Sequence, residues 1–99
     1  MIVAGRTNLY LDASEPASNG GQDGRIWAKF LKAAGLTDAC DATRCGDDSP
    51  IDRVAYRSGS GADLDATAVT VRADRFVDRD GRPLSDGPPV EVAFGWKPA

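Results

Sequence analysis

Three short polar segments carry the side chains best suited to chemistry in this sequence. They read AGRTN (4–8), IDRV (51–54) and LSDG (84–87), and each stands at one end of a segment with strand character. Loops from neighbouring strands often converge at one end of a sheet, so we expect the three segments to meet. The side chains of interest in this group are the guanidinium of Arg6, the amide of Asn8 and the carboxylates of Asp52 and Asp86.

Two kinds of chemistry are open to that group. Asp52 and Asp86 offer the oxygen ligands that Mg²⁺ prefers, whereas a guanidinium binds a carboxylate through paired hydrogen bonds. We favour pairing of Arg6 with these aspartates, because a metal ion beside Arg6 would place two positive charges together. Arg6 and Asn8 also form a candidate site for a phosphate or sulfate ion, which arginine binds readily.

The residues that nucleophilic catalysis and zinc binding usually require are missing from this sequence. The sequence has no histidine, so Ser85 has no imidazole to activate it, and we expect its hydroxyl to stabilise its own loop. Cys40 and Cys45 have no further Cys or His with which to complete four zinc ligands. We therefore prefer a local disulfide between them, which is typical of an oxidising compartment.

Length and composition limit the classes of protein to consider. The chain has 99 residues, 41% of them apolar and 27% charged, which is ordinary for one globular domain over residues 1–99. The net charge is −3 and the basic residues are scattered, so binding of nucleic acid through a positive face is not expected. No apolar run approaches the ~20 residues that cross a bilayer, so no membrane span is predicted.

Apolar periodicity predicts one helix and four strands. The apolar residues between Ile26 and Ala34 follow helical spacing, with Gly35 as the C-cap. Strands are expected over residues 2–4, 51–58, 66–76 and 90–96, the first of them buried on both faces. The order β-α-β-β-β predicts an α/β fold: a four-stranded mixed sheet with one main helix on one face. Residues 46–48 (GDD) predict a solvated loop.

A single helix covers only one face of such a sheet. Val3, Val54, Tyr56, Val69 and Phe94 belong to an apolar set that is too large for one helix to cover. Exposed apolar patches of that kind mark association surfaces. We therefore expect a homodimer whose sheets pack face to face into four layers around a two-fold axis.

Four longer segments carry a family resemblance. They read VAGRTNLY, FLKAAGLTDAC, IDRVAYRS and RFVDRDGRPLSDGPPVEVAFGW, and together they extend over nearly the whole chain. In this order they resemble the C-terminal half of the endonuclease/exonuclease/phosphatase superfamily, closest to its secreted sphingomyelinase-like members. The resemblance implies a half-sandwich of DNase I-like fold, a relation to Mg²⁺-dependent phosphodiester hydrolysis and an extracellular location.

Transferred residue by residue, the resemblance implies a degenerate site. Asn8 matches an asparagine that contacts phosphate, Asp52 an aspartate that orients a catalytic histidine, and Asp86 an aspartate that shapes the metal and phosphate pocket. Arg6 stands where the family has the aspartate that orients the attacking water, and Gly87 stands where it has the histidine. The family's acidic metal ligand belongs to its first half, to which nothing in this sequence corresponds.

Two hypotheses for function follow from these losses. Removing members of a catalytic unit costs several orders of magnitude in rate, so we predict a half-domain with no catalytic residue and no cofactor that self-associates through its sheet face. The alternative is a metal-dependent phosphodiesterase, sphingomyelinase- or nuclease-like, that is active only when assembled with another copy or with a missing N-terminal half.

Overall fold

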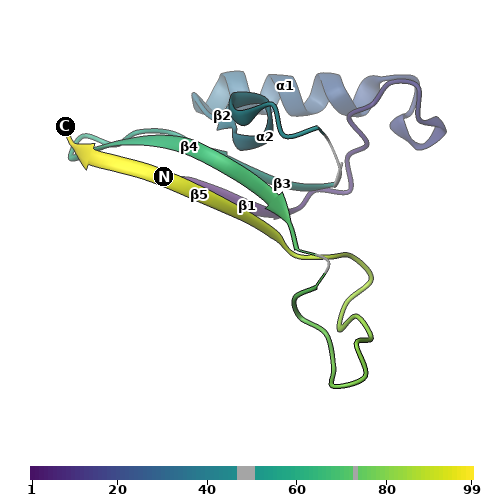
Figure 1. Ribbon diagram of the computed structural model, residues 1–99. Coiled ribbons are helices and arrows are strands. Elements are labelled where there is room, and N and C mark those ends of the chain that lie inside the picture. The colour runs from purple at the N-terminus through teal and green to yellow at the C-terminus, as the bar shows by residue number, and fades with distance from the viewer. Residues whose placement is uncertain (47–50, 73) are drawn as a thin grey trace.

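Two helices, a short 3-10 turn and five strands make up the fold. The computed structural model describes residues 1–46, 51–72 and 74–99. In chain order the elements are β1 (Ile2–Arg6), η1 (Pro16–Ser18), α1 (Gln22–Ala34), β2 (Thr37–Asp38), α2 (Ala39–Thr43), β3 (Asp52–Tyr56), β4 (Ala62–Val71) and β5 (Val90–Pro98). Both helices lie on the same side of the strands (Figure 1).

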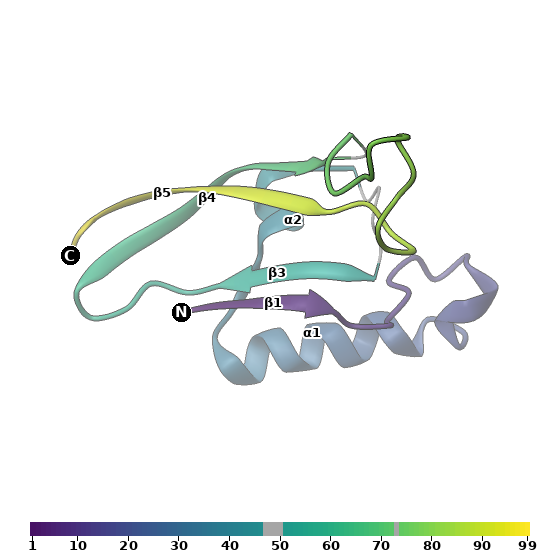
Figure 2. The same cartoon turned by 90° about the horizontal axis from the view of Figure 1, so that it is seen from below.

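The strands form two antiparallel sheets, in the orders β1-β3-β2 and β4-β5. The mixed α/β class is therefore confirmed, but the single four-stranded mixed sheet that the sequence predicted is divided in two. One reason is that β2, which is too short to have been predicted, takes the second edge of β3 at Ala55 and Tyr56. Strands β4 and β5 pair with each other as a long two-stranded ribbon, and β5 runs alongside β3 (Figure 2). Tyr56 and Phe94 join the two sheets with ring centroids 5.3 Å apart.

Helix α1 supplies most of the small core. Its residues Trp27, Leu31 and Ala34 pack with Leu36 and Ala55, as the helical spacing predicted. Gly35 adopts a left-handed φ of 66°, and its N–H bonds to the carbonyls of the last helical turn, so the predicted C-cap is confirmed. The helix starts at Gln22, before the apolar pattern begins.

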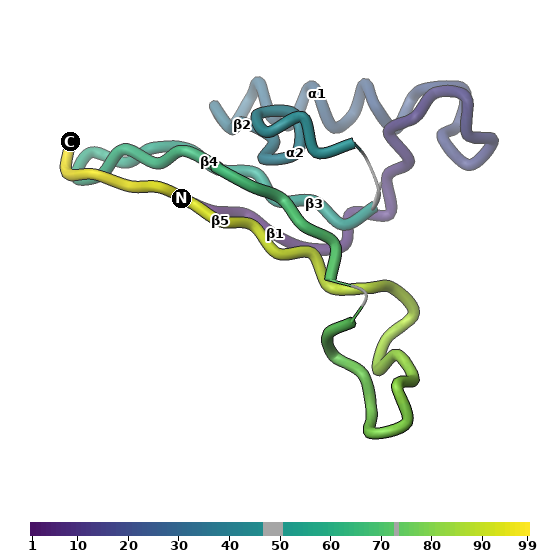
Figure 3. The backbone as a smooth tube through the Cα atoms, viewed as in Figure 1, coloured from purple at the N-terminus to yellow at the C-terminus, as the bar shows by residue number. Residues whose placement is uncertain are grey.

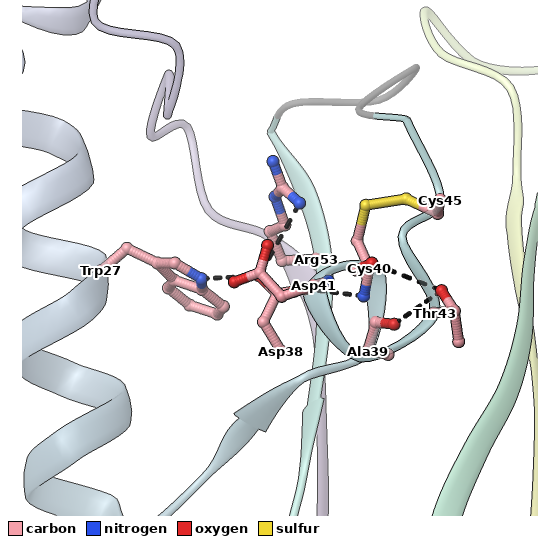
Figure 4. Close-up of a disulfide and its surroundings, with 8 residues drawn as sticks. All are labelled: Trp27, Asp38, Ala39, Cys40, Asp41, Thr43, Cys45 and Arg53. Carbon is pink, nitrogen blue, oxygen red and sulfur yellow. Dashed lines mark hydrogen bonds and ion pairs between the residues drawn. A yellow bond between two sulfur atoms is a disulfide. The ribbon is translucent and has the colours of Figure 1, made fainter.

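A buried polar network connects α1, α2 and β3. Asp38 is 2% exposed and caps α2, since its carboxylate accepts the N–H of Cys40 at 2.8 Å. The same carboxylate accepts the indole N–H of Trp27 at 2.7 Å and lies 3.7 Å from the guanidinium of buried Arg53 (Figure 4). The predicted Cys40–Cys45 disulfide is confirmed, and it links the first turn of α2 to the residue that follows its C-cap, Arg44. Short as it is, α2 is therefore fixed at both ends.

Three sequence-based expectations need correction or comment. Strand β1 is exposed along all five residues rather than buried on both faces, because the core forms from α1, Leu36 and Ala55 and includes no β1 residue. Strand β4 ends at Val71 instead of continuing to residue 76. Of the predicted loop 46–48, residues 47 and 48 lie outside the described part of the chain.

The chain is flat, and one segment protrudes from it. The extents are 45 × 37 × 18 Å, and the segment between β4 and β5 projects from the strands on the side away from the helices (Figure 3). Among the described residues, no helix combines the length and the apolar character needed to cross a membrane.

Candidate functional site

The three polar segments meet at one open groove. It has a volume of about 550 Å³ and lies where β1 ends and where β3 and β5 begin. Its lining includes Arg6, Asp52, Phe76, Leu84, Asp86 and Gly87. Asn8 is not among the described lining residues, and its backbone has a left-handed φ of 58°. The groove therefore collects four of the five residues that the sequence singled out.

Arg6 and Asp86 form the principal contact across the groove. The Nη1 atom of Arg6 donates to both carboxylate oxygens of Asp86, at 2.7 and 2.8 Å. This hydrogen bond, together with the positive charge of Arg6, lowers the pKa of Asp86 below its usual value. The same contact raises the pKa of Arg6. Both side chains are solvent-exposed, so the pair orients the loop rather than adding much to stability.

Strand register places Arg6 beside Asp52. The two residues are direct cross-strand partners in the β1–β3 ladder. Side chains alternate along β3, and the buried Arg53 and Ala55 face the helices, so Asp52 is directed to the opposite side, where the groove lies. The network around Asp38 thus fixes Asp52 indirectly, by holding its neighbour Arg53 in the core.

Position 87 faces Asp52 directly. A Cβ atom built on Gly87 would lie 3.6 Å from Oδ2 of Asp52, which is ordinary van der Waals contact. Ser85 holds the loop in this conformation, because its Oγ donates to the carbonyl of Gly87 at 2.7 Å and accepts the Gly87 N–H at 3.3 Å. The expected loop-stabilising role of Ser85 is therefore confirmed.

The described residues do not fit the Mg²⁺ ion that the resemblance implies. No group of three or more Asp, Glu, Cys or His side chains comes together within the described ranges. Both carboxylate oxygens of Asp86 already accept hydrogen bonds from the cationic Arg6. A hard dication takes six or more oxygen ligands, and here the positive charge of Arg6 lies 2.7 Å from the Asp86 carboxylate that would have to supply one of them.

Sequence reasoning missed two apolar residues that border the groove. Phe76 is 71% exposed with a left-handed φ of 51°, and Leu84, whose N–H bonds to the Phe76 carbonyl, is 66% exposed. The sequence assigned Phe76 to the end of a strand. That assignment is wrong because the chain leaves the ribbon after Val71, and a β pattern carries no signal for the left-handed turn that follows.

Comparison with characterised proteins gives one group of relatives. The chain is 32% identical over 82 residues to sphingomyelinases of Mycobacterium bovis and of two strains of Mycobacterium tuberculosis. The match covers 69% of this chain but only 17% of the length of each relative. No protein-family model matches the chain, and no solved structure matches it. The similarity supports a distant relation to a sphingomyelinase.

Proposed function

We propose that this chain is a phosphodiesterase-like half-domain without hydrolytic activity of its own, which associates with a second copy through apolar residues of its sheets. The proposal includes its descent from the C-terminal half of the endonuclease/exonuclease/phosphatase superfamily. The similarity to mycobacterial sphingomyelinases supports the phosphodiesterase relation. The disulfide is in keeping with an extracellular location.

The Arg6–Asp86 contact is the observation that carries the proposed inactivity. Metal-assisted phosphodiester hydrolysis needs a cation to activate water and to stabilise charge on phosphorus. In this groove a guanidinium holds the carboxylate oxygens that such a cation would need, at 2.7 and 2.8 Å. Position 87, opposite Asp52, has no side chain that could donate or accept a proton. Among the described residues, the absence of a cluster of three or more metal-ligating side chains and of an acid or base side chain at position 87 supports the proposed inactivity.

Exposed apolar side chains on the sheets support the proposed association. Trp96 on β5 is 70% exposed and Ile2 on β1 is 51% exposed. No residue of β4 or β5 is fully buried, although valines occur in both strands and β5 also carries Phe94 and Trp96. Apolar surface of this kind is typical of an interface.

Turnover of an aryl phosphodiester, bis(p-nitrophenyl) phosphate, tests the first part of the proposal. With Mg²⁺ present, the wild-type chain is expected to release no p-nitrophenolate above a buffer control. Magnesium-dependent turnover that Asp52→Ala or Asp86→Ala abolishes would refute inactivity and support the assembled enzyme. Glu91→Ala is the matched control, because it removes an exposed carboxylate that does not line the groove.

Sedimentation equilibrium tests the association separately. The wild-type chain is expected to form a dimer at micromolar concentration, and Trp96→Ser is expected to shift the equilibrium toward monomer. Lys97→Ser, at the neighbouring exposed position, is the control and is expected to leave the mass unchanged. A monomeric wild-type chain with intact secondary structure would exclude self-association.

A further inference from the structure

The Cys40–Cys45 bridge lies between an open hollow and a small apolar cavity. Both cysteines are half-buried, and both line the two spaces. The hollow has a volume of about 630 Å³, which is large enough for a small organic thiol to enter. The cavity has a volume of about 30 Å³, and the valines that line it are Val54, Val69, Val71, Val90 and Val92. The bridge is therefore accessible from the hollow while it covers valines of β3, β4 and β5.

The cavity under the bridge adjoins the groove of the candidate site. The residues that line both spaces are Asp52, Arg53, Val54 and Val90. Helix α2 carries Cys40 and packs on β3 and β4, so it forms the cover of this cavity. Figure 4 shows the bridge joining α2 to Cys45, beyond the end of the helix. Opening the end of α2 would therefore expose apolar surface beside Asp52.

The last turn of α2 depends on a left-handed residue that is not glycine. Arg44 is the C-cap with φ 55° and ψ 49°, and its N–H bonds to the carbonyls of Asp41 and Cys40. Glycine is the usual residue in this conformation, because a Cβ atom makes it unfavourable. The N–H of Cys45 bonds to the carbonyl of Cys40 at 3.1 Å, so this hydrogen bond joins the same two residues as the bridge. The bridge thus keeps a turn closed that the backbone alone does not favour.

The first turn of α2 has its own support. Asp38 caps it by accepting the Cys40 N–H at 2.8 Å, and the same carboxylate is fixed by the indole of Trp27. A helix of five residues has little stability of its own in water, so each end depends on its local contacts. Loss of the bridge is therefore expected to open the end at Arg44 and to leave the end at Asp38 in place.

We propose that the Cys40–Cys45 bridge is a site of thiol–disulfide exchange, and that its reduction by a dithiol opens the last turn of α2 and exposes the valines beside the groove. Accessible disulfides are the ones that thiols reduce in folded proteins. One thiolate of the dithiol attacks a cysteine sulfur, the S–S bond breaks, and the other cysteine leaves as a thiolate. The second thiolate of the dithiol then displaces the first cysteine. The dithiol ends as a disulfide, and its two protons pass to Cys40 and Cys45.

This exchange requires neither the proposed hydrolytic inactivity nor the proposed dimer, so it goes beyond the function proposed above. Dithiothreitol, added to the whole chain under native conditions, is the probe. Alkylation and mass spectrometry count the thiols that are released, and NMR follows hydrogen exchange at the amides of Arg44 and Cys45. We expect both amides to exchange about tenfold faster or more after reduction, while the amides of α1 stay protected. The methyl signals of the cavity valines are expected to shift.

Two variants separate the bridge from other causes. Replacing Cys40 and Cys45 by serine together is expected to reproduce the fast exchange at residues 44 and 45 with no reagent present. Arg44→Gly is the matched control, because glycine adopts the left-handed conformation at little cost. Its amides at positions 44 and 45 are expected to stay protected after the bridge is reduced.

Three results would overturn the proposal. The first is a bridge that resists dithiothreitol until urea unfolds the chain, since it would then not be an exchange site. The second is a reduced chain in which the amides of Arg44 and Cys45 keep their protection and the valine methyl signals do not move. The third is loss of protection in α1 together with α2, since the bridge would then hold the whole fold. Each result is read without turnover and without the mass of the dimer.

Discussion

Replacing Asp38 by alanine is expected to be among the most destabilising changes that this chain can undergo. Asp38 is 2% exposed, caps α2 through the Cys40 N–H, accepts the Trp27 indole and faces the buried Arg53 at 3.7 Å. Removing one member of a buried ion pair costs about 3–5 kcal/mol, and losing an N-cap costs about 1 kcal/mol. Because these terms overlap and the ion pair is long, we expect a loss of about 3–4 kcal/mol.

Urea denaturation measures that loss, with Trp27 as the reporter in a Trp96→Phe background. Asp38→Asn keeps an oxygen for the cap and the indole, so it is expected to lose less than Asp38→Ala. Asp63→Ala removes an exposed aspartate of β4 and is expected to change the free energy of unfolding by no more than about 0.5 kcal/mol. A loss below about 1 kcal/mol for Asp38→Ala would refute the role given to this network.

Three further predictions concern the groove and the disulfide. Arg6→Ala should raise the pKa of Asp86 toward its usual value, because Arg6 lowers that pKa in the wild type. NMR titration of the carboxyl carbon measures the change. In the wild type, the Arg6–Asp86 ion pair is formed at pH values above the pKa of Asp86 and is lost as the pH falls through it. Arg72→Ala is the control: it should raise the pKa of Glu91 and leave Asp86 unchanged. Replacing Cys40 and Cys45 by serine together should cost about 2 kcal/mol in urea unfolding, since the closed loop is short; no change would show that α2 does not depend on the bridge. Asp86→Ala should increase the gain in melting temperature from added phosphate, because it releases the guanidinium of Arg6 to bind an anion; an equal gain in the Arg6→Ala variant would contradict this.

Long periodic elements of this fold were predictable, but short ones were not. Helix α1 has an apolar stripe ending in Gly35, and each of these features specifies helix independently of the rest of the chain. Strand β2 has two residues and α2 has five, so neither can show a period. Their existence depends on Asp38 meeting Trp27 and Arg53, which are distant in sequence. A buried arginine is rarely expected without knowledge of its partner.

The candidate site, too, was predictable from the sequence only in part. The strand-end positions of Arg6, Asp52 and Asp86 were visible in the sequence, and the structure places them around one groove. The exposure of Phe76 and the position of Asn8 were not visible, because each depends on a left-handed backbone at a residue other than glycine. Asparagine adopts this conformation readily, but for Phe76 it is set by the surrounding loop and not by the residue type.

Whether the groove holds a divalent cation is decided most directly by titrating Mn²⁺ into the isotopically labelled chain and following paramagnetic broadening of its amide signals. With Arg6 holding both oxygens of Asp86, we expect no selective broadening at Asp52, Asp86 or Gly87. Arg6→Ala, measured in parallel, shows whether the arginine is what excludes the ion. Saturable broadening confined to those three residues in the wild-type chain would contradict a non-catalytic groove.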